Sequence, residues 1–179
     1  MVGMFVPAYG DPQALAVWGM HYNGYAVLDE RGLCPSGWHS ASDEDFIVLE
    51  AHLGLEENLY EFTCRGESIN LGGMFKEEGT IEAGTGYWNY PNSGSNNASG
   101  LAMRANGWRS PTGVFETGGG EYGLDGNFWT STFVPEPSFQ PDPDGGLIRR
   151  RCDHDDFGVQ RDSYGVHCGF AVRCLKSAE

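Results

Sequence analysis

The stretch YNGYAVLDERGLCPSGWH, residues 22–39, is the most informative part of this chain of 179 residues. Near the other end, GFAVRC (residues 169–174) again combines glycine, aromatic residue and cysteine. Two such segments predict that the ends of the chain come together in a loop-rich β-type fold. A fold of this kind presents a surface, and neither segment contains a pattern typical of catalysis.

The composition is that of one large domain rich in glycine and aromatic residues. With 27 glycines and 13% aromatic residues, the chain is suited to short strands and long ordered loops. Its net charge of −14 would repel a phosphate backbone, so we expect no nucleic-acid partner. The apolar runs are far shorter than a membrane span, so we expect no membrane insertion. Residues 1–20 lack the basic region of a signal peptide, which indicates either a removed leader or another route of release, as for virion proteins.

A capped helix follows the opening stretch. Ser42 is the predicted N-cap, and Asp45, three residues further on, is its capping-box partner. Apolar residues recur at helical spacing from Phe46, and Gly54 ends the helix. A second short helix is predicted over residues 55–62, with its apolar side chains turned inward.

Beyond residue 63 the helical period ends, and short β-like runs recur between loops. These runs are LAMRA, GWRS, GVFE, NFWTSTF, GLIRRRC and GFAVRCL. The prediction is an α+β domain over residues 21–179, in which one or two helices pack on a twisted antiparallel sheet with long Gly/Pro/Asn-rich loops. Residues 1–20 form an apolar arm, which is either a first strand or a segment that docks on a partner subunit.

Several motifs occur in an order that resembles the Fibrobacter succinogenes major paralogous domain family. YNGYAV, RGLCPSGWH and SDEDF resemble its start, GYWN, ASGLAMRANGWR and FWTST follow, and GFAVRCLK resembles its end. The resemblance covers residues 22–176 and implies a C-type-lectin-like fold, related to that of sulfatase-modifying (formylglycine-generating) proteins. The chain departs from the family at Gly24, where an aromatic residue is common, and the usual first strand is not recognisable in residues 1–20.

The resemblance also implies a disulfide. In C-type-lectin-like folds a bridge commonly ties the first helical region to the last strand, which here corresponds to Cys34 and Cys174. The alternative is two reduced thiols in a cytosolic setting. Cys152 and Cys168 are candidates for a second bridge, and Cys64 has no evident mate.

The triplet Gln140-Pro141-Asp142 resembles the one by which galactose-binding C-type lectins hold Ca²⁺ and sugar together, with a cis proline. Gln140, Asp142 and Asp144 are therefore the candidate calcium ligands, since Ca²⁺ prefers oxygen donors. The Trp-Asn-Asp partner of such lectins is absent, and the surrounding PEPSFQPDPDGG is typical of a solvated acidic loop. We therefore expect no required cofactor, with Ca²⁺ binding as the less favoured alternative.

The sulfatase-modifying relatives are enzymes that use a close pair of reactive cysteines near the C-terminus. Cys168 and Cys174 are near each other here, but Cys174 falls in the closing strand motif, the place of a structural cysteine. No nucleophile and base stand at a spacing typical of covalent catalysis. We therefore predict no catalytic residues and no enzyme activity.

The segment between FWTST and GFAVRC, residues 133–168, has little apolar periodicity. In related lectin-like proteins, including phage receptor-binding proteins, the corresponding segment forms the ligand-facing surface. Its charged and aromatic residues are of the kinds that make recognition surfaces, or they simply cover the outer face of the sheet. The candidate face consists of Phe133, Arg149, Arg150, Arg151, Asp155, Asp156, Phe157, Gln160, Arg161 and Tyr164.

These observations predict a non-catalytic binding module exposed on a virion surface, outside the cell or on a cell surface. It would be a phage surface, fibre or decoration component, or a bacterial adhesin-like protein, with a glycan or a protein as its receptor. The first alternative is a structural assembly subunit of a virion or surface layer that self-associates or docks on other subunits through residues 1–20. The second is an enzyme of the sulfatase-modifying type.

Overall fold

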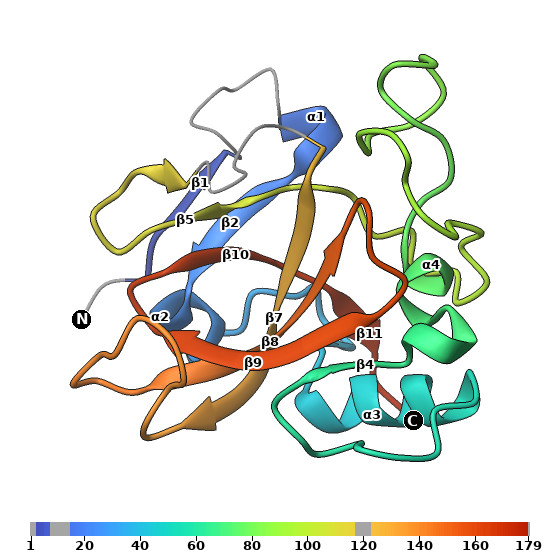
Figure 1. Ribbon diagram of the computed structural model, residues 1–179. Helices are drawn as coiled ribbons and strands as arrows, with labels where there is room; N and C mark the ends of the chain where they lie inside the picture. Colours follow the sequence, from blue (N-terminus) through green and yellow to red (C-terminus); the bar gives the residue numbers. More distant parts are fainter. Residues whose placement is uncertain (1–2, 8–14, 117–122, 179) are drawn as a thin grey trace.

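Short helices lie mainly in the first half of the chain and a large sheet is completed by the second half in the computed structural model, which describes residues 3–7, 15–116 and 123–178 (Figure 1). The helices are α1 (Leu15–Trp18), α2 (Gly24–Val27), α3 (Asp43–His52), the 3₁₀ helix η2 (Glu67–Ile69) and α4 (Leu71–Phe75). The strands are β1 (Phe5–Pro7), β2 (Met20–Asn23), β3 (Trp38–Ser40), β4 (Cys64–Arg65), β5 (Trp108–Arg109), β6 (Phe115–Glu116), β7 (Asp125–Val134), β8 (Gly146–Asp153), β9 (Val159–Gly165), β10 (Gly169–Val172) and β11 (Cys174–Lys176). The predicted α+β class is confirmed.

The main sheet has the strand order β1-β2-β10-β7-β8-β9-β4, with β5 beside β10 and β6 beside β5. Only β10 and β7 run parallel within the described part of the chain, so the sheet is largely antiparallel. Strands β3 and β11 form a separate two-stranded sheet. None of the helices described here is long and apolar enough to cross a membrane.

The two ends of the chain meet, as the opening stretch predicts. Phe170 of β10 pairs with Tyr22 of β2, and Leu175 of β11 pairs with His39 of β3. A disulfide joins Cys34 to Cys174 across a separation of 140 residues. The Cys34–Cys174 bridge implied by the family resemblance is therefore confirmed.

The prediction of a second disulfide is wrong, because Cys152 and Cys168 are free thiols in different hydrophobic cores. Cys152 packs in a core on the helical side of the sheet, together with Phe46, Phe75 and Trp88 among others. Cys168 packs in a second core with Trp129 and Phe170 among others. Cys64 is also a free thiol.

Helix α3 begins and ends where its caps predict. The Ser42 hydroxyl accepts from the Asp45 backbone N–H, the Asp45 carboxylate accepts from the Ser42 N–H, and Gly54 follows at a φ of 102°. Its buried side chains include Phe46 and Ile47, but also Asp43 and Glu50. Half of this helix interface is therefore acidic and requires cationic partners from the sheet.

The second predicted helix is wrong, because residues 55–62 form turns. The physical reason lies in their carbonyl groups, which accept hydrogen bonds from buried arginines and do not form the i→i+4 bonds of an α-helix. Arg65 donates to the carbonyl oxygens of residues 58, 59 and 61, and Arg161 donates to that of Tyr60. Asn58 takes a left-handed φ of 58°, and Phe62 is exposed instead of turned inward.

The N-terminal arm contributes strand β1 to the main sheet, and its residues Leu15–Trp18 form α1. Strand β1 pairs with β2, and the Met4 N–H donates to the Asn23 side chain at 3.0 Å. The arm thus contributes the edge strand, while residues 8–14, where the sequence has Gly10, Asp11 and Pro12, lie outside the described residues. Gly24 directly follows the last residue of β2, Asn23. A Cβ at Gly24 would come within 2.8 Å of Val166, which explains why this chain has no aromatic residue at that position.

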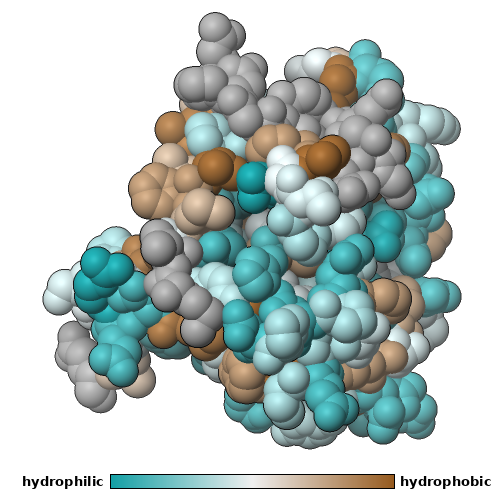
Figure 2. Space-filling view, turned by 90° about the vertical axis from the view of Figure 1, so that its left-hand side faces the viewer, coloured by the Kyte–Doolittle hydropathy of each residue, from teal (hydrophilic) through white to brown (hydrophobic). Residues whose placement is uncertain are grey.

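The sheet edge at β1 lies on a side of the molecule where apolar residues are exposed. Figure 2 shows this side: hydrophilic residues cover much of it, and apolar residues lie in several groups among them, one of them at the upper left. In β1 and just before it, Phe5 and Met4 are exposed by 61% and 52%. An edge strand with exposed apolar side chains is a surface on which another chain can pair.

Candidate functional site

The three consecutive arginines of β8 do not lie on one surface, because successive side chains of a strand face opposite sides of the sheet. Arg150 points to the side on which α3 packs, where it meets Asp43 and Glu50. Arg149 and Arg151 point to the other side, which we call the outer face. In β9, Arg161 likewise faces α3. The alternate residues Gln160, Asp162 and Tyr164 face outward.

Arg150 and Arg161 are therefore not part of an exposed recognition face, contrary to the prediction. Arg150 Nε lies 2.6 Å from Glu50, and Arg150 Nη1 lies 2.7 Å from Asp43. Arg161 Nη2 lies 2.6 Å from the other Asp43 oxygen, and Arg65 pairs with Glu50. These five residues, all buried, form what we call the inner ion-pair cluster.

Electrostatics explain why these residue types occur together. A charged group is buried at low cost only when an opposite charge and hydrogen bonds replace its water. Burial acts to raise the pKa of Asp43, but hydrogen bonds from Arg161 and Arg150 and their charges outweigh it and lower the pKa below 3.8. The inner ion-pair cluster thus holds α3 against β8 and β9, and a ligand cannot reach it because all five residues are buried.

On the outer face, strands β4, β8 and β9 and the loop before β8 enclose a cavity of about 250 Å³, which we call the outer cavity. Five of the ten predicted face residues line it: Arg149, Arg151, Asp156, Gln160 and Tyr164. The other lining residues are Cys64, Phe139, Asp153, Gly158 and Asp162. The outer cavity is therefore rich in charge and bounded by aromatic rings.

The floor of the outer cavity is held rigidly by Arg149. Its guanidinium forms a two-pronged ion pair with Asp162, at 2.6 and 3.0 Å, and also bonds Asn127. The Tyr164 ring covers the same guanidinium at 4.1 Å, and Phe139 stacks on Tyr164 with ring centres 5.2 Å apart. Arg149 is only 3% exposed, so it positions Asp162 and Tyr164 and is itself the base of the site.

Arg151 is the more accessible cation of the outer cavity, with about a third (34%) of its side chain exposed. It lies 2.5 Å from Asp153 and 3.5 Å from Asp125. Burial raises the pKa of Asp153 and of Asp125, although the charge of Arg151 opposes the shift. These acids differ from Asp43, because a single shared arginine does not fully offset their loss of water.

Three predicted residues lie outside the outer cavity: Phe133, Asp155 and Phe157 are exposed elsewhere on the surface. Sequence reasoning missed Phe139, Asp153 and Asp162. Asp162 had a usable signal, since it alternates with Gln160 and Tyr164 in VQRDSYG as a strand requires. Phe139 had none, because a loop brings it onto β9.

Two of the three candidate calcium ligands are brought together. Ligand atoms of Asp142, Asp144 and His167 lie within 4.8 Å of one another, and Gln140 is exposed with a left-handed φ of 49°. Protein donors already bind both carboxylates: His167 pairs with Asp142, and the Tyr25 hydroxyl donates to Asp144 at 2.5 Å. Among the described residues the cis peptide bond is Tyr90–Pro91, so the triplet lacks the cis proline of sugar-binding lectins.

The thiols near the C-terminus do not form a reactive pair. Cys174 is bonded to Cys34, and Cys168 is completely buried. Burial raises the pKa of Cys168 to about 12, which disfavours the thiolate that nucleophilic chemistry requires. This arrangement differs from the two-cysteine site of the sulfatase-modifying enzymes.

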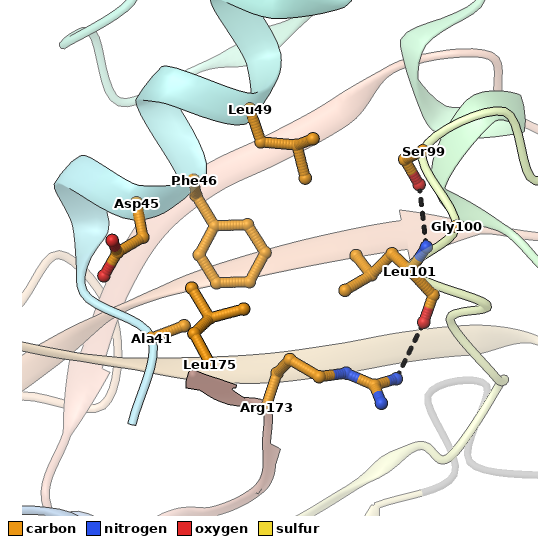
Figure 3. Close-up of a pocket in the computed structure, with 9 residues that line it drawn as sticks. All are labelled: Ala41, Asp45, Phe46, Leu49, Ser99, Gly100, Leu101, Arg173 and Leu175. Carbon is orange, nitrogen blue, oxygen red and sulfur yellow. Dashed lines mark hydrogen bonds between the residues drawn. The ribbon is translucent and has the colours of Figure 1, made fainter. Parts of the chain in front are cut away.

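A second cavity, of about 290 Å³, lies between α3 and the loop at residues 99–101. Figure 3 shows Phe46 and Leu49 on one side facing Leu101 on the other, with Leu175 below. Of its two charged lining residues, Asp45 accepts hydrogen bonds from Ser42 and Arg173 donates to the Leu101 carbonyl oxygen, and the other walls are mainly apolar. The outer cavity, with its several charges, is the stronger candidate for specific recognition.

Comparison with known proteins identifies a family but no characterised relative. The family described as the Fibrobacter succinogenes major domain matches residues 6–176, from within β1 to the end of β11. No curated protein and no solved structure matches the chain. The matched segment covers nearly all of the 179 residues, so the chain belongs to the Fibrobacter succinogenes major domain family.

Proposed function

We propose that this chain is a C-type-lectin-like, non-catalytic binding module that is exposed on a virion or cell surface and recognises a glycan or protein receptor at the outer cavity. The observation that carries the proposal is the composition of this cavity. Charged side chains of both signs, a glutamine and a stacked aromatic pair converge there on adjacent strands. Glycan hydroxyls and polar protein surfaces both bind such combinations of donors, acceptors and ring faces.

The rigidity of the cavity floor supports the same proposal. Arg149 is fixed by Asp162 and by the rings above it, so Tyr164 and Asp162 are held in place before a ligand arrives. A site that is ordered in advance loses less conformational entropy on binding. The accessible group in this arrangement is Arg151, which makes it the residue of choice for a test.

The experiment measures binding of the labelled chain to a glycan array and to whole bacterial cells, each with Ca²⁺ and with EDTA. We expect binding to a restricted set of glycans or cells that Arg151→Met weakens at least about tenfold, the effect of one lost charge-assisted contact. Arg31→Met is the matched control. The Arg31 side chain is 87% exposed, forms its ion pair with Asp29, and does not line the outer cavity. Absence of binding to every glycan and cell type, or equal binding by Arg151→Met and Arg31→Met, would contradict the proposal.

The two metal conditions distinguish the outer cavity from the calcium triplet. Binding that persists in EDTA supports recognition at the outer cavity. Binding that disappears in EDTA and is weakened by Asp142→Asn, but not by Arg151→Met, would instead assign recognition to the Asp142, Asp144 and His167 group.

A structural assembly subunit is the second candidate function, favoured by the exposed edge at β1. Phe5 is 61% exposed on an edge strand, where another subunit could add a strand. Light scattering should then report an oligomer for the intact chain and a monomer for Phe5→Lys. Val48→Lys, an exposed apolar position on α3, is the matched control, and a monomeric intact chain would count against assembly through this edge.

A further inference from the structure

Arg173, between β10 and β11, is a half-buried cation that has no acidic partner in the described part of the chain. Its Nη2 donates to the Leu101 carbonyl oxygen at 2.8 Å, and its Nε is buried without a hydrogen-bond partner among the described residues. Figure 3 shows the side chain below the apolar cavity, with its guanidinium directed at Leu101. The guanidinium carbon also lies 5.6 Å from the centre of the Phe128 ring.

The four arginines that are fully buried, Arg65, Arg149, Arg150 and Arg161, are each paired with a carboxylate. The chain has 25 acidic against 11 basic residues, so acidic residues are not scarce. A guanidinium withdrawn from water without a counter-charge raises the free energy of the folded state. Burial and the nearby charge of Arg104 lower the pKa of Arg173, which is the electrostatic consequence.

Arg173 lines a cavity of about 420 Å³ beside α1 and β2, together with Arg104. Arg104 is already compensated, because it lies 3.1 Å from Glu77 and also donates to the Val17 carbonyl oxygen at 2.7 Å. No aspartate or glutamate is among the described residues that line this cavity. Among the described residues, the cavity therefore carries the positive charge of Arg173 without a counter-charge.

The remaining walls indicate what kind of anion would fit. Phe128, Ala171 and Trp18 provide apolar and aromatic surface. A ligand with one negative charge would balance Arg173, whereas a phosphate monoester carries about −1.5 to −2 at neutral pH and would be overcharged for the site. A carboxylate also matches the planar fork of a guanidinium.

We propose that this cavity binds a small organic monocarboxylate, whose carboxylate pairs with Arg173 and whose apolar body lies against Phe128 and Trp18. This site is separate from the outer cavity and does not depend on the proposed receptor function. Since Arg173 follows β10 and directly precedes Cys174, its backbone is fixed by the sheet and by the disulfide on either side. The cation is thus held in place before the ligand binds.

Benzoate, benzamide and phenyl phosphate are suitable probes, with binding to the full chain measured by calorimetry. The three share an aromatic body and differ in the charge of the attached group. We expect benzoate to bind at least about tenfold more tightly than neutral benzamide and more tightly than phenyl phosphate. Equal affinities for benzoate and benzamide, or no measurable binding of benzoate, would overturn the proposal without any variant.

Two substitutions at Arg173 then test the residue itself. Arg173→Gln should reduce the affinity for benzoate to that for benzamide, while Arg173→Lys, which keeps the charge but not the fork, should give an intermediate value. Arg31→Gln, at an exposed arginine, is the matched control and should leave benzoate binding unchanged. Unchanged benzoate affinity in a folded Arg173→Gln variant would show that the ligand lies elsewhere.

Discussion

The two faces of the β8–β9 hairpin carry similar residues with different consequences. On the inner face, Arg150 and Arg161 are buried against Asp43 and Glu50, and every one of these charges has an opposite charge within 3 Å. On the outer face, Arg151 shares two acids at 2.5 and 3.5 Å and remains one-third exposed. Complete pairing makes the inner face structural, whereas incomplete pairing leaves the outer face able to bind another molecule.

The electrostatic difference follows from the number of partners. Asp43 has two arginines, and its pKa is lowered despite burial. Asp125 shares one arginine at 3.5 Å, has a buried oxygen without a partner among the described residues, and has a raised pKa. Two aspartates, Asp43 at the start of α3 and Asp125 in β7, thus have opposite effects on stability as pH changes.

The largest expected effect is that of Arg150→Met on stability. The substitution removes the cation shared by Asp43 and Glu50 and leaves both carboxylates buried, which should lower the free energy of unfolding by about 3–5 kcal/mol. Arg151→Met, the matched change on the outer face, should cost below about 1 kcal/mol because its ion pairs are partly exposed. Urea unfolding followed by circular dichroism measures both, and equal losses would refute the distinction between the faces.

A smaller effect, with a characteristic pH dependence, is expected for the acids. Asp43→Asn should lower the free energy of unfolding at pH 7 by about 2–3 kcal/mol, since it weakens hydrogen bonds to two charged groups. The folded pKa of Asp43 lies below its unfolded value of 3.8, so its stabilisation is complete above 3.8 and is lost as the pH falls through the folded pKa. The gap between the wild type and this variant should therefore close at low pH.

Asp125→Asn is the matched comparison and should show the opposite sign. Burial raises the pKa of Asp125 above 3.8, so its charged form destabilises the protein at pH values above the folded pKa. The variant should be at least as stable as the wild type at pH 7, and the two should converge as the pH falls toward 3.8. Urea unfolding at pH 7 and at pH 4 measures this, and a less stable Asp125→Asn at pH 7 would argue against the assignment.

The helix that carries the inner acids should be moderately sensitive to its cap. Ser42→Ala removes the hydroxyl that accepts from the Asp45 N–H, and should lower the free energy of unfolding by about 1 kcal/mol. Ser68→Ala, at an exposed serine of η2, should stay within about 0.5 kcal/mol. If the outer cavity is independent of α3, Ser42→Ala should leave receptor binding unchanged, and a parallel loss of binding would show that the two faces are coupled.

The smallest effect is expected at the exposed rim. Phe157→Ser should change stability by less than about 0.5 kcal/mol, because this side chain is exposed and does not line the outer cavity. Receptor affinity should also be unchanged. A loss of affinity as large as that of Arg151→Met, measured on the same array or cells, would extend the recognition surface beyond the outer cavity.

Local signals in the sequence were reliable where a residue interacts with its own neighbours. Ser42 and Asp45 are three residues apart, and both hydrogen bonds of their capping box are present. The predicted strands over residues 127–133 and 146–152 lie within β7 and β8. The helix over residues 55–62 failed because Arg65 and Arg161 bind its carbonyl groups, and Arg161 comes from a strand about 100 residues away.

The candidate site was only half predictable for the same reason. The composition of residues 133–168 indicated a recognition surface, and five of the ten named residues line one cavity. Strand β9 is not among the predicted strands, because polar side chains on both of its faces leave little apolar periodicity; α3 covers one face and the outer cavity lies on the other. The sequence alone therefore does not show which of Arg149, Arg150 and Arg151 face α3 and which face the outer cavity.

The opening stretch and its counterpart predicted from sequence that the chain ends meet, and their resemblance to the Fibrobacter succinogenes major domain family implied the Cys34–Cys174 bridge; both are confirmed. Those features depend on local motifs, which a sequence displays directly. The tertiary structure decided which arginines are structural and which accessible, and it leaves Arg173 without a counter-charge among the described residues. Such properties depend on groups far apart in the chain, since the energy of a charge in a folded protein is set by the water it loses and the opposite charges it meets.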